Sequence, residues 1–460
     1  MSDACGAQAM SVGRVHAGDE RATSVRWRIV AWIVLASLVA FVLRFNMSVA
    51  APTMMRDLGL SETQLGLILG AFAWTYALCQ IPGGILGARF GPRRTMTVLF
   101  IAWFATTALM ASVPHGLPVL VAVALLVILR AAQGAVQAPV FPVTCGGSMF
   151  VWLPARHWAL GNSLSAAGTT VGAALVGPGV TWLVLTLGWR QSFFLVAPLG
   201  LLLAAIWWRD YRDEPSAHRG VNRLENALIT SERGAAAREA PVGWTRLLAD
   251  RELLLLTASY FCSNYVFFLF FNWFYYYLTE IRHVPATTGG YFLAAQWTVG
   301  GVASLAGGIV CDRLSTRFGA RTGCRATAVG GLVLCAPLLI AGTLANAPLW
   351  SVALLSASFG CVAFVDAAYW SAAMRMAGAQ AQGATGVMNT GGGVAGGVGA
   401  MLVPVLAASF GWTVAVASGA VCLLVGAGLW FGIRADVTIQ SRAVAQPAPS
   451  GSLRHTLVVS

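Results

Sequence analysis

The same arginine-rich segment occurs twice in this chain, and each copy joins two long stretches without charge. The copies are GILGARFGPRR (84–94) and GIVCDRLSTR (308–317), and their glycines lie 224 positions apart. A Gly-Trp pair recurs with nearly the same spacing, at 188–189 and 411–412. A repeat that encloses several apolar stretches is typical of a duplicated bundle of membrane helices. We therefore expect two similar halves.

Apolar runs of about twenty residues, the length that crosses a bilayer, occur throughout the chain. The runs are 28–50, 63–87, 95–113, 119–142, 162–184, 191–208, 253–278, 291–311, 326–344, 349–373, 384–407 and 413–433. With 57% hydrophobic and only 10% charged residues, most of the surface must face lipid. The sequence thus predicts an all-α membrane protein with twelve transmembrane helices in two pseudo-symmetric six-helix bundles, at 28–208 and 253–433.

The net charge of +12 is explained by how the arginines are distributed over the two sides of the membrane. With the N-terminus inside, 24 of the 29 arginines fall in cytoplasmic segments, and only Arg56, Arg190 and Arg282 fall outside. The positive-inside rule then places both tails (1–27 and 434–460) and the linker (209–252) in the cytoplasm. We expect a multi-pass protein of the bacterial cell inner membrane, and no nucleic-acid partner.

Catalytic and metal-binding patterns are not found in the sequence. The nine cysteines are scattered without paired spacing, which argues against disulfides, a metal site or a cofactor. There is also no nucleophile motif, and no span carries paired carboxylates. These observations argue against an enzyme.

Two arginines lie near the middle of predicted spans. Arg44 and Arg130 would each cost about 2.5–3.5 kcal/mol at the bilayer centre, so such residues usually serve a function. Asp366 is the one well-embedded acid, which leaves an excess of positive charge. Guanidinium groups bind carboxylates through two parallel hydrogen bonds, so this balance favours an anionic ligand. The structural alternative is that one arginine pairs with Asp366 while the other bonds to helix carbonyls.

The repeated segment resembles the loop signature of the major facilitator superfamily. Within it, residues 44–84, RAAQGAVQAPVFP (130–142) and MNTGGGVAGG (388–397) resemble the anion:cation symporter family. That resemblance implies transport of an organic carboxylate, such as a sugar acid or an aromatic acid, usually with protons. It also implies that Arg44, Arg130, Tyr76 and Asn389 contact the substrate. For Tyr76 and Asn389, bonding between helices is the competing interpretation.

Further polar residues could line the same site. Gln133 and Gln137 follow Arg130 by three and seven positions and so share its helical face. Asn264 and Asn272 lie on one face of an aromatic-rich helix. We include Gln137, Asn264 and Asn272 among the expected substrate-binding residues.

The chain departs from the family pattern at three positions. The acid of the first hairpin is replaced by Ala88, while Asp312 is present in the second. We expect Arg89, Arg93, Asp312 and Arg313 to act in gating. The two acids that usually carry protons are replaced by Leu43 and Gln137, which leaves Asp366 as the candidate coupling residue.

The sequence therefore predicts a monomeric secondary transporter of a small organic anion, working by alternating access with a proton or sodium ion as the coupling cation. Two alternatives stay open. One is an uncoupled facilitator or exporter, and the other is a transporter-like membrane sensor of an organic anion.

Overall fold

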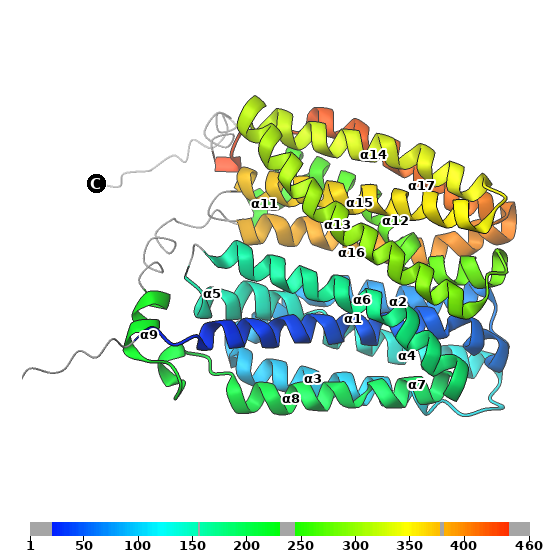
Figure 1. The fold of residues 1–460 in the computed structure, drawn as a ribbon, viewed down its shortest axis with the longest axis horizontal. Coiled ribbons are helices and arrows are strands. Elements are labelled where there is room, and N and C mark those ends of the chain that lie inside the picture. Colours follow the sequence, from blue (N-terminus) through cyan, green and yellow to red (C-terminus); the bar gives the residue numbers. More distant parts are fainter. Residues whose placement is uncertain (1–20, 155–156, 231–243, 378–380, 441–460) are drawn as a thin grey trace, which may run out of the picture.

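A computed structural model describes residues 21–154, 157–230, 244–377 and 381–440. Eleven helices in this part of the chain are long and apolar enough to span a membrane, and the bent pair Glu62–Gln80 and Pro82–Phe90 makes a twelfth. They run roughly parallel, with linker helix α9, the start of α1 and the end of α17 at the same end of the molecule, here called the linker end (Figure 1). The prediction of an all-α membrane fold with about twelve spans is confirmed.

The first six spans contain nine helical segments. They are α1 (Val25–Leu58), α2 (Glu62–Phe90), α3 (Pro92–Ala111), α4 (Val119–Gln137) with the π-helix η1 (Pro142–Ser148) and α5 (Met149–Trp152), α6 (Trp158–Leu187), and α7 (Trp189–Val196) with α8 (Pro198–Asp210). α2 bends by 51° at Pro82, where proline removes a helix hydrogen bond.

The second half repeats this order after a linker that contains α9 (Arg223–Thr230) and α11 (Trp244–Ala249). Its spans are α12 (Arg251–Tyr276) with η4 (Tyr277–Ile281), α13 (Ala286–Phe318), α14 (Ala320–Leu344), α15 (Pro348–Ala377), α16 (Ala381–Phe410) and α17 (Trp412–Leu429). The linker residues 231–243 and the last twenty residues of the C-terminal tail lie outside the described part.

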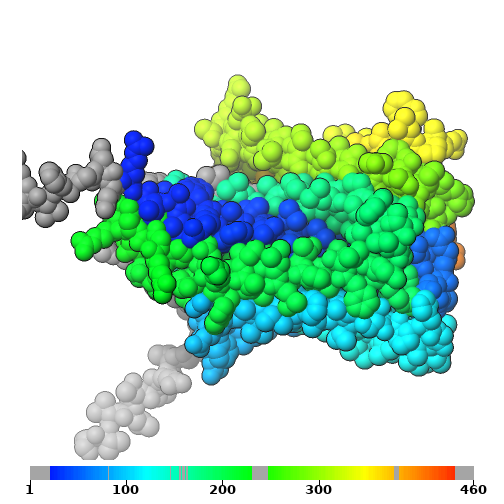
Figure 2. All heavy atoms as spheres, turned by 60° about the horizontal axis from the view of Figure 1, so that its bottom comes forward, coloured from blue at the N-terminus to red at the C-terminus, as the bar shows by residue number. Residues whose placement is uncertain are grey.

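The two halves use the same packing pattern. In the first half, α1 packs on α6, α2 on α4 and α3 on the α7–α8 span. In the second half, α12 packs on α16, α13 on α15 and α14 on α17. In each bundle the first span thus contacts the fifth, the second contacts the fourth and the third contacts the sixth. Figure 2 shows part of this packing on the surface of the first bundle, where α1 lies between α6 and α8.

The turns confirm the duplication but correct its register at the hairpins. Gly188 and Gly411, from the two Gly-Trp pairs, both adopt positive φ, at 88° and 84°. The hairpin turns occur at Gly91 and Gly319, with φ of 81° and 85°, which are 228 positions apart. Arg89 is therefore the structural counterpart of Arg317, four residues beyond the Arg313 that the sequence spacing suggested.

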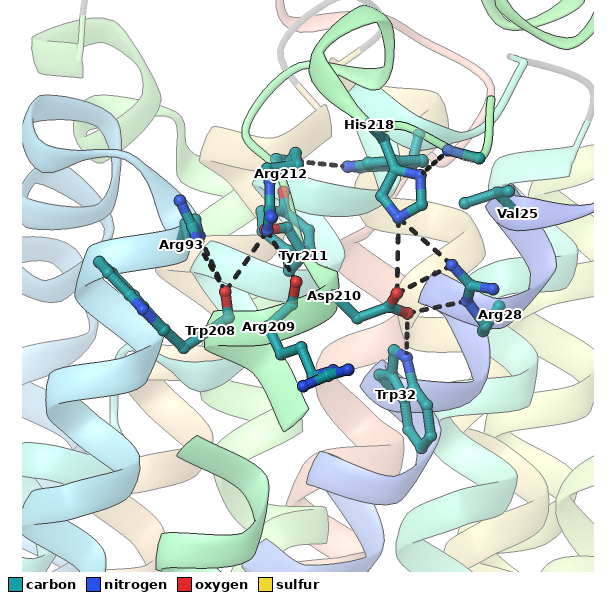
Figure 3. Close-up of polar contacts among 12 residues, drawn as sticks. Val25, Arg28, Trp32, Arg93, Trp208, Arg209, Asp210, Tyr211, Arg212 and His218 are labelled. Atoms are coloured by element: carbon teal, nitrogen blue, oxygen red, sulfur yellow. Dashed lines mark hydrogen bonds and ion pairs between the residues drawn. The ribbon is translucent and has the colours of Figure 1, made fainter. Parts of the chain in front are cut away.

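The first bundle is tied together at the linker end by Asp210, the last residue of α8. Its carboxylate accepts two hydrogen bonds of 2.8 Å from the guanidinium of Arg28 and one of 2.8 Å from the indole of Trp32 (Figure 3). His218 approaches the same carboxylate at 3.4 Å. These contacts fix the start of α1 against the end of α8.

Linker helix α9 provides the cap of α1. The fully buried Glu225 accepts hydrogen bonds from the backbone N–H groups of Val25 and Arg26, at 3.2 and 3.0 Å. It also accepts from the hydroxyl of Thr23 and pairs with the Arg26 guanidinium at 3.0 Å. A carboxylate at a helix N-terminus satisfies free N–H groups and interacts favourably with the helix dipole.

The bundles meet along α2 with α16 and α6 with α13. Small residues allow this approach: a Cβ on Gly393 would lie 2.7 Å from that of Ala77, and one on Gly397 would lie 2.7 Å from the Trp74 ring. The glycine-rich segment of α16 thus serves close helix packing. Away from this interface, large apolar side chains are exposed, such as Leu120 at 78% and Leu305 at 72%, as expected of a surface in lipid.

Candidate functional site

The candidate site is built where α4 crosses α2. A Cβ on Gly134 would lie 2.3 Å from the backbone oxygen of Phe72 and 2.3 Å from the hydroxyl of Thr75, so only glycine allows these helices to come so close. Arg130 lies one turn before Gly134 on α4. The crossing therefore brings Arg130 next to the Phe72 ring.

Two arginines from different helices converge on that ring. The guanidinium carbon of Arg44 lies 5.0 Å from the centre of the Phe72 ring, and that of Arg130 lies 4.6 Å from it. Arg44 also lies 4.4 Å from the Tyr76 ring and 5.1 Å from the Phe41 ring. Aromatic rings at these distances stabilise a guanidinium through the cation–π interaction.

Both arginines are buried, at 6% exposure for Arg44 and 1% for Arg130. Arg130 donates a 2.6 Å hydrogen bond to Gln133, whose amide in turn donates to Thr107 at 3.2 Å. Arg44 has no hydrogen-bond partner among the described residues, and neither arginine forms an ion pair with a described carboxylate. Two buried cations thus lie together without a carboxylate partner in the described part of the chain.

Gln137 extends this polar face of α4. Its side chain is fully buried, and neither its amide nitrogen nor its amide oxygen has a partner within the described structure. Buried polar groups are normally hydrogen-bonded, so the amide of Gln137 is free to bond to a polar ligand that enters the site. The π-helix η1 follows a few residues later, and such wide turns are frequent near functional sites.

The second bundle contributes an aromatic wall beside Arg44. Phe45 of α1 lies 4.1 Å from Phe271 of α12 and 5.4 Å from Trp297 of α13, between ring centres. Trp297 also contacts Phe41, at 6.1 Å. Part of the aromatic run of α12 therefore faces the other bundle rather than lipid.

Two polar residues one turn apart on α2 make different contacts, one with Arg44 and the other with the second bundle. Tyr76 contacts Arg44, and Gln80 accepts a 3.0 Å hydrogen bond from the amide of Asn389 on α16. For Asn389 the structure therefore shows the bonding between helices that was the competing interpretation, here across the two bundles.

Asp366 forms part of a separate cluster inside the second bundle. Its carboxylate accepts a 3.3 Å hydrogen bond from the hydroxyl of Tyr260, and Asn264 donates to the backbone oxygen of Tyr260 at 3.0 Å. Asp366 thus pairs with neither arginine in this structure. Asn272 is buried and makes no hydrogen bond with any described residue.

The expected gating residues occupy different environments. Arg93 is held within the first bundle. Its backbone N–H donates to Asp213 at 2.8 Å. Its guanidinium donates to the Trp208 oxygen at 2.7 Å (Figure 3). Arg89, Asp312 and Arg313 are exposed and form no ion pair with described residues. In this conformation the two hairpins are not joined by salt bridges in the described region.

The opposite end of the molecule carries a bridge that the sequence did not reveal. Glu62, at the start of α2, accepts a 2.7 Å hydrogen bond from the Tyr276 hydroxyl and a 3.3 Å bond from the Trp412 indole. Both donors belong to the second bundle, so Glu62 joins the bundles at this end. Phe72 and Tyr260 were likewise missed, because an aromatic residue in an apolar span carries no signal of the face it occupies.

Comparison with known proteins agrees with this architecture. The family model described as Major Facilitator Superfamily matches residues 33–400. The solved structure of a bacterial homologue of the human lysosomal transporter Spinster matches with a TM-score of 0.71, covering 89% of this chain and 97% of the other at 17% identity.

Curated relatives resemble the chain over most of its length. A probable sulfoacetate transporter of Cupriavidus necator is 31% identical, covering 79% of this chain and 83% of the relative. A probable galactarate/D-glucarate transporter of Escherichia coli K12 is 29% identical, with 69% and 73% covered. A D-galactonate transporter of Escherichia coli O6:H1 is 27% identical, with 87% and 94% covered.

Proposed function

Because the chain belongs to the Major Facilitator Superfamily, we propose that it moves a small organic anion across the membrane by alternating access, with Arg44 and Arg130 as the anion-binding residues. The family membership makes it a membrane transporter and not an enzyme. In such carriers two bundles rock around a site near the bilayer midplane. Here that site adjoins the interface where α1 and α2 meet the second bundle.

The proposal that the substrate is an anion rests on one observation. Two guanidinium groups are buried beside Phe72, and no described carboxylate neutralises them. An isolated buried charge is costly, so a site of this kind is completed by a ligand of opposite charge. Relatives named as transporters of sulfoacetate, galactarate/D-glucarate and D-galactonate support an organic acid.

The orientation belongs to the same proposal. Linker helix α9, the start of α1 and the end of α17 lie at the linker end, and the segments predicted to be cytoplasmic hold 24 of the 29 arginines, so the positive-inside rule assigns this end to the cytoplasm. The Glu62 bridge then lies on the outer side. We propose a monomer in the bacterial inner membrane, with cation-coupled uptake supported by Asp366, the partly buried acid of α15. An uncoupled facilitator or exporter is the second candidate, since Leu43 and Gln137 cannot exchange protons.

The test is binding of organic acids to purified protein. We expect sugar acids, aromatic acids or short diacids to raise the unfolding temperature of the wild type, and Arg44→Ala and Arg130→Ala each to abolish this effect. Lysine should rescue poorly, because it cannot make the bidentate contact. Arg321→Ala, at an exposed position near the start of α14, is the matched control. Undiminished stabilisation in both site variants would refute the proposal.

A further inference from the structure

We infer that the transported anion carries two negative groups, joined by a short chain, one for each buried arginine. This inference rests on the proposed function and adds the charge of the substrate to it. It follows from the charge balance around Phe72 and from the distance between the two guanidinium groups.

The charge balance is unusual for a buried site. Arg130 experiences the positive charge of Arg44, and no described carboxylate offsets either group. The residue before Arg44 is the fully buried Leu43, and the polar residue two turns beyond Arg130 is Gln137, so both adjacent positions are neutral. Asp366 is hydrogen-bonded to Tyr260 in the other bundle.

A ligand with one negative group would leave a net positive charge at the site, whether one or both arginines contact that group. Like charges repel strongly where water is excluded, and a buried charge that is only partly neutralised keeps part of its desolvation cost. A second negative group removes both penalties at once. The site should therefore prefer a dianion to a monoanion of the same shape.

The geometry limits the length of that dianion. Both guanidinium carbons are measured from the same ring centre, at 5.0 and 4.6 Å, so they lie at most about 10 Å apart. Charge-assisted contacts of about 2.8 Å from each arginine fit carboxylate or sulfonate groups separated by only a few carbons. The unpartnered amide of Gln137 is available to bond one of these groups.

The first test compares matched ligands on the wild-type protein at pH 7.5. Succinate, glutarate and sulfoacetate are each titrated against their monoamides, which keep the size but lose one charge. We expect at least tenfold tighter binding of one or more diacids than of the matching monoamide. Equal or tighter binding of the monoamides would overturn the inference.

Monoanions of other shapes separate this inference from the proposed function. If gluconate or benzoate binds while no diacid does, the anion transporter stands and the dianion is refuted. If no member of either panel binds, both are refuted.

The second test restores a negative charge to the site. Gln137→Glu should reduce the preference for the diacid over its monoamide at least tenfold, because the new carboxylate neutralises one arginine. Gln137→Met, of similar length and neutral, should retain the preference. If the ratio of diacid affinity to monoamide affinity were equal in the two variants, the charge argument would be contradicted. The wild-type comparison stands independently if the glutamate variant fails to fold.

Discussion

Phe72 is the residue on which the two buried arginines meet. Its ring lies within 5.0 Å of both guanidinium carbons, and it is itself buried. It therefore compensates part of the desolvation of two cations and holds them in a defined relation to each other. No charged or polar group could do this without changing the charge or the hydrogen bonding of the site.

We predict that Phe72→Leu weakens binding of the anion by about 5- to 30-fold, since two cation–π contacts worth about 0.5–1 kcal/mol each are lost. Leucine keeps most of the apolar volume, so the fold should persist. Isothermal titration with the best ligand of the panel measures the change. Phe194→Leu, on the lipid-facing side of α7 at 49% exposure, is the control. Wild-type affinity in Phe72→Leu would show that the ring does not organise the arginines.

The sequence could identify Arg44 and Arg130 because a charge in an apolar span is rare and costly. Phe72 could not be found in the same way, since aromatic residues are common in such helices and their contacts depend on tertiary packing. Gln133 and Gln137 were placed on the face of Arg130 by helical spacing, and the structure shows the Gln133 contact directly. The absence of a contact between Asp366 and either arginine required the three-dimensional arrangement.

At the level of helices, the crossing of α2 and α4 determines where the arginines lie. Gly134 makes the crossing close, because a side chain there would collide with the backbone of Phe72. After the bend at Pro82, α2 continues to pack on the fourth span, where Gly83 faces Pro139 and Gly87 faces Val143. The close approach at Gly134 thus belongs to a series of close glycine contacts between α2 and this span.

We predict that Gly134→Ala lowers stability by about 1–3 kcal/mol through overpacking and reduces anion binding by shifting α2. Gly330→Ala is a matched control, since it lies in the middle of α14 with open space around it. There alanine should be neutral or stabilising by up to about 1 kcal/mol, because it favours helix more than glycine does. Thermal unfolding in detergent measures the stability of both variants. Equal unfolding temperatures for the two variants would contradict the close crossing.

The spacing of the repeat predicts the equivalent positions of the two halves correctly at some turns and incorrectly at others. The Gly-Trp pairs correctly predicted equivalent helix starts at Gly188 and Gly411. At the hairpins the matched residues gave the wrong register. From Gly308, α13 continues four residues further before its turn than α2 does from Gly84. Four residues are about one helical turn, so the extension preserves the face of the helix and leaves the apolar pattern intact. Only the turn conformation at Gly91 and Gly319 reveals the true register.

For the whole molecule, the contacts between bundles define the conformation. At the end opposite the linker, Glu62 bridges to Tyr276 and Trp412, while the hairpins at the linker end show no salt bridges between described residues. A carrier that alternates must break such a bridge to open that end. The sequence could not predict this bridge, because Glu62 looks like an ordinary residue in the first turn of a helix.

We predict that Glu62→Ala opens the end opposite the linker. Loss of hydrogen bonds to a charged acceptor, at about 1.5–3 kcal/mol, should shift the population by about 10- to 150-fold. The readout is labelling of Ala400→Cys, buried at the bundle interface, by an impermeant thiol reagent in a background without native cysteines. Tyr276→Phe should act in the same direction. Ser61→Ala, which removes only the cap of α2, should not, and unchanged labelling in Glu62→Ala would refute the bridge as a gate.

The energetics of the whole cycle follow from the charge that moves. A potential of 100 mV, negative inside, opposes entry of each negative charge by about 2.3 kcal/mol, so a dianion would face about twice that amount. Uptake therefore requires accompanying cations, whereas export does not. Asp366, which is partly buried on α15, is the acid that we propose for this role, and the hydroxyl of Tyr260 donates a hydrogen bond directly to it.

We predict that proteoliposomes containing the wild type accumulate the anion under an imposed proton or sodium gradient, and that Asp366→Asn only exchanges it. The asparagine keeps the size and can still bond to Tyr260, but it cannot carry a proton or neutralise a cation. Exchange in the variant shows that the site and the rocking motion are intact, so a loss of accumulation alone identifies coupling. If the wild type responds to neither gradient, coupled uptake is wrong and the carrier is an uncoupled facilitator or exporter. If Asp366→Asn accumulates substrate as well as the wild type, another group carries the cation.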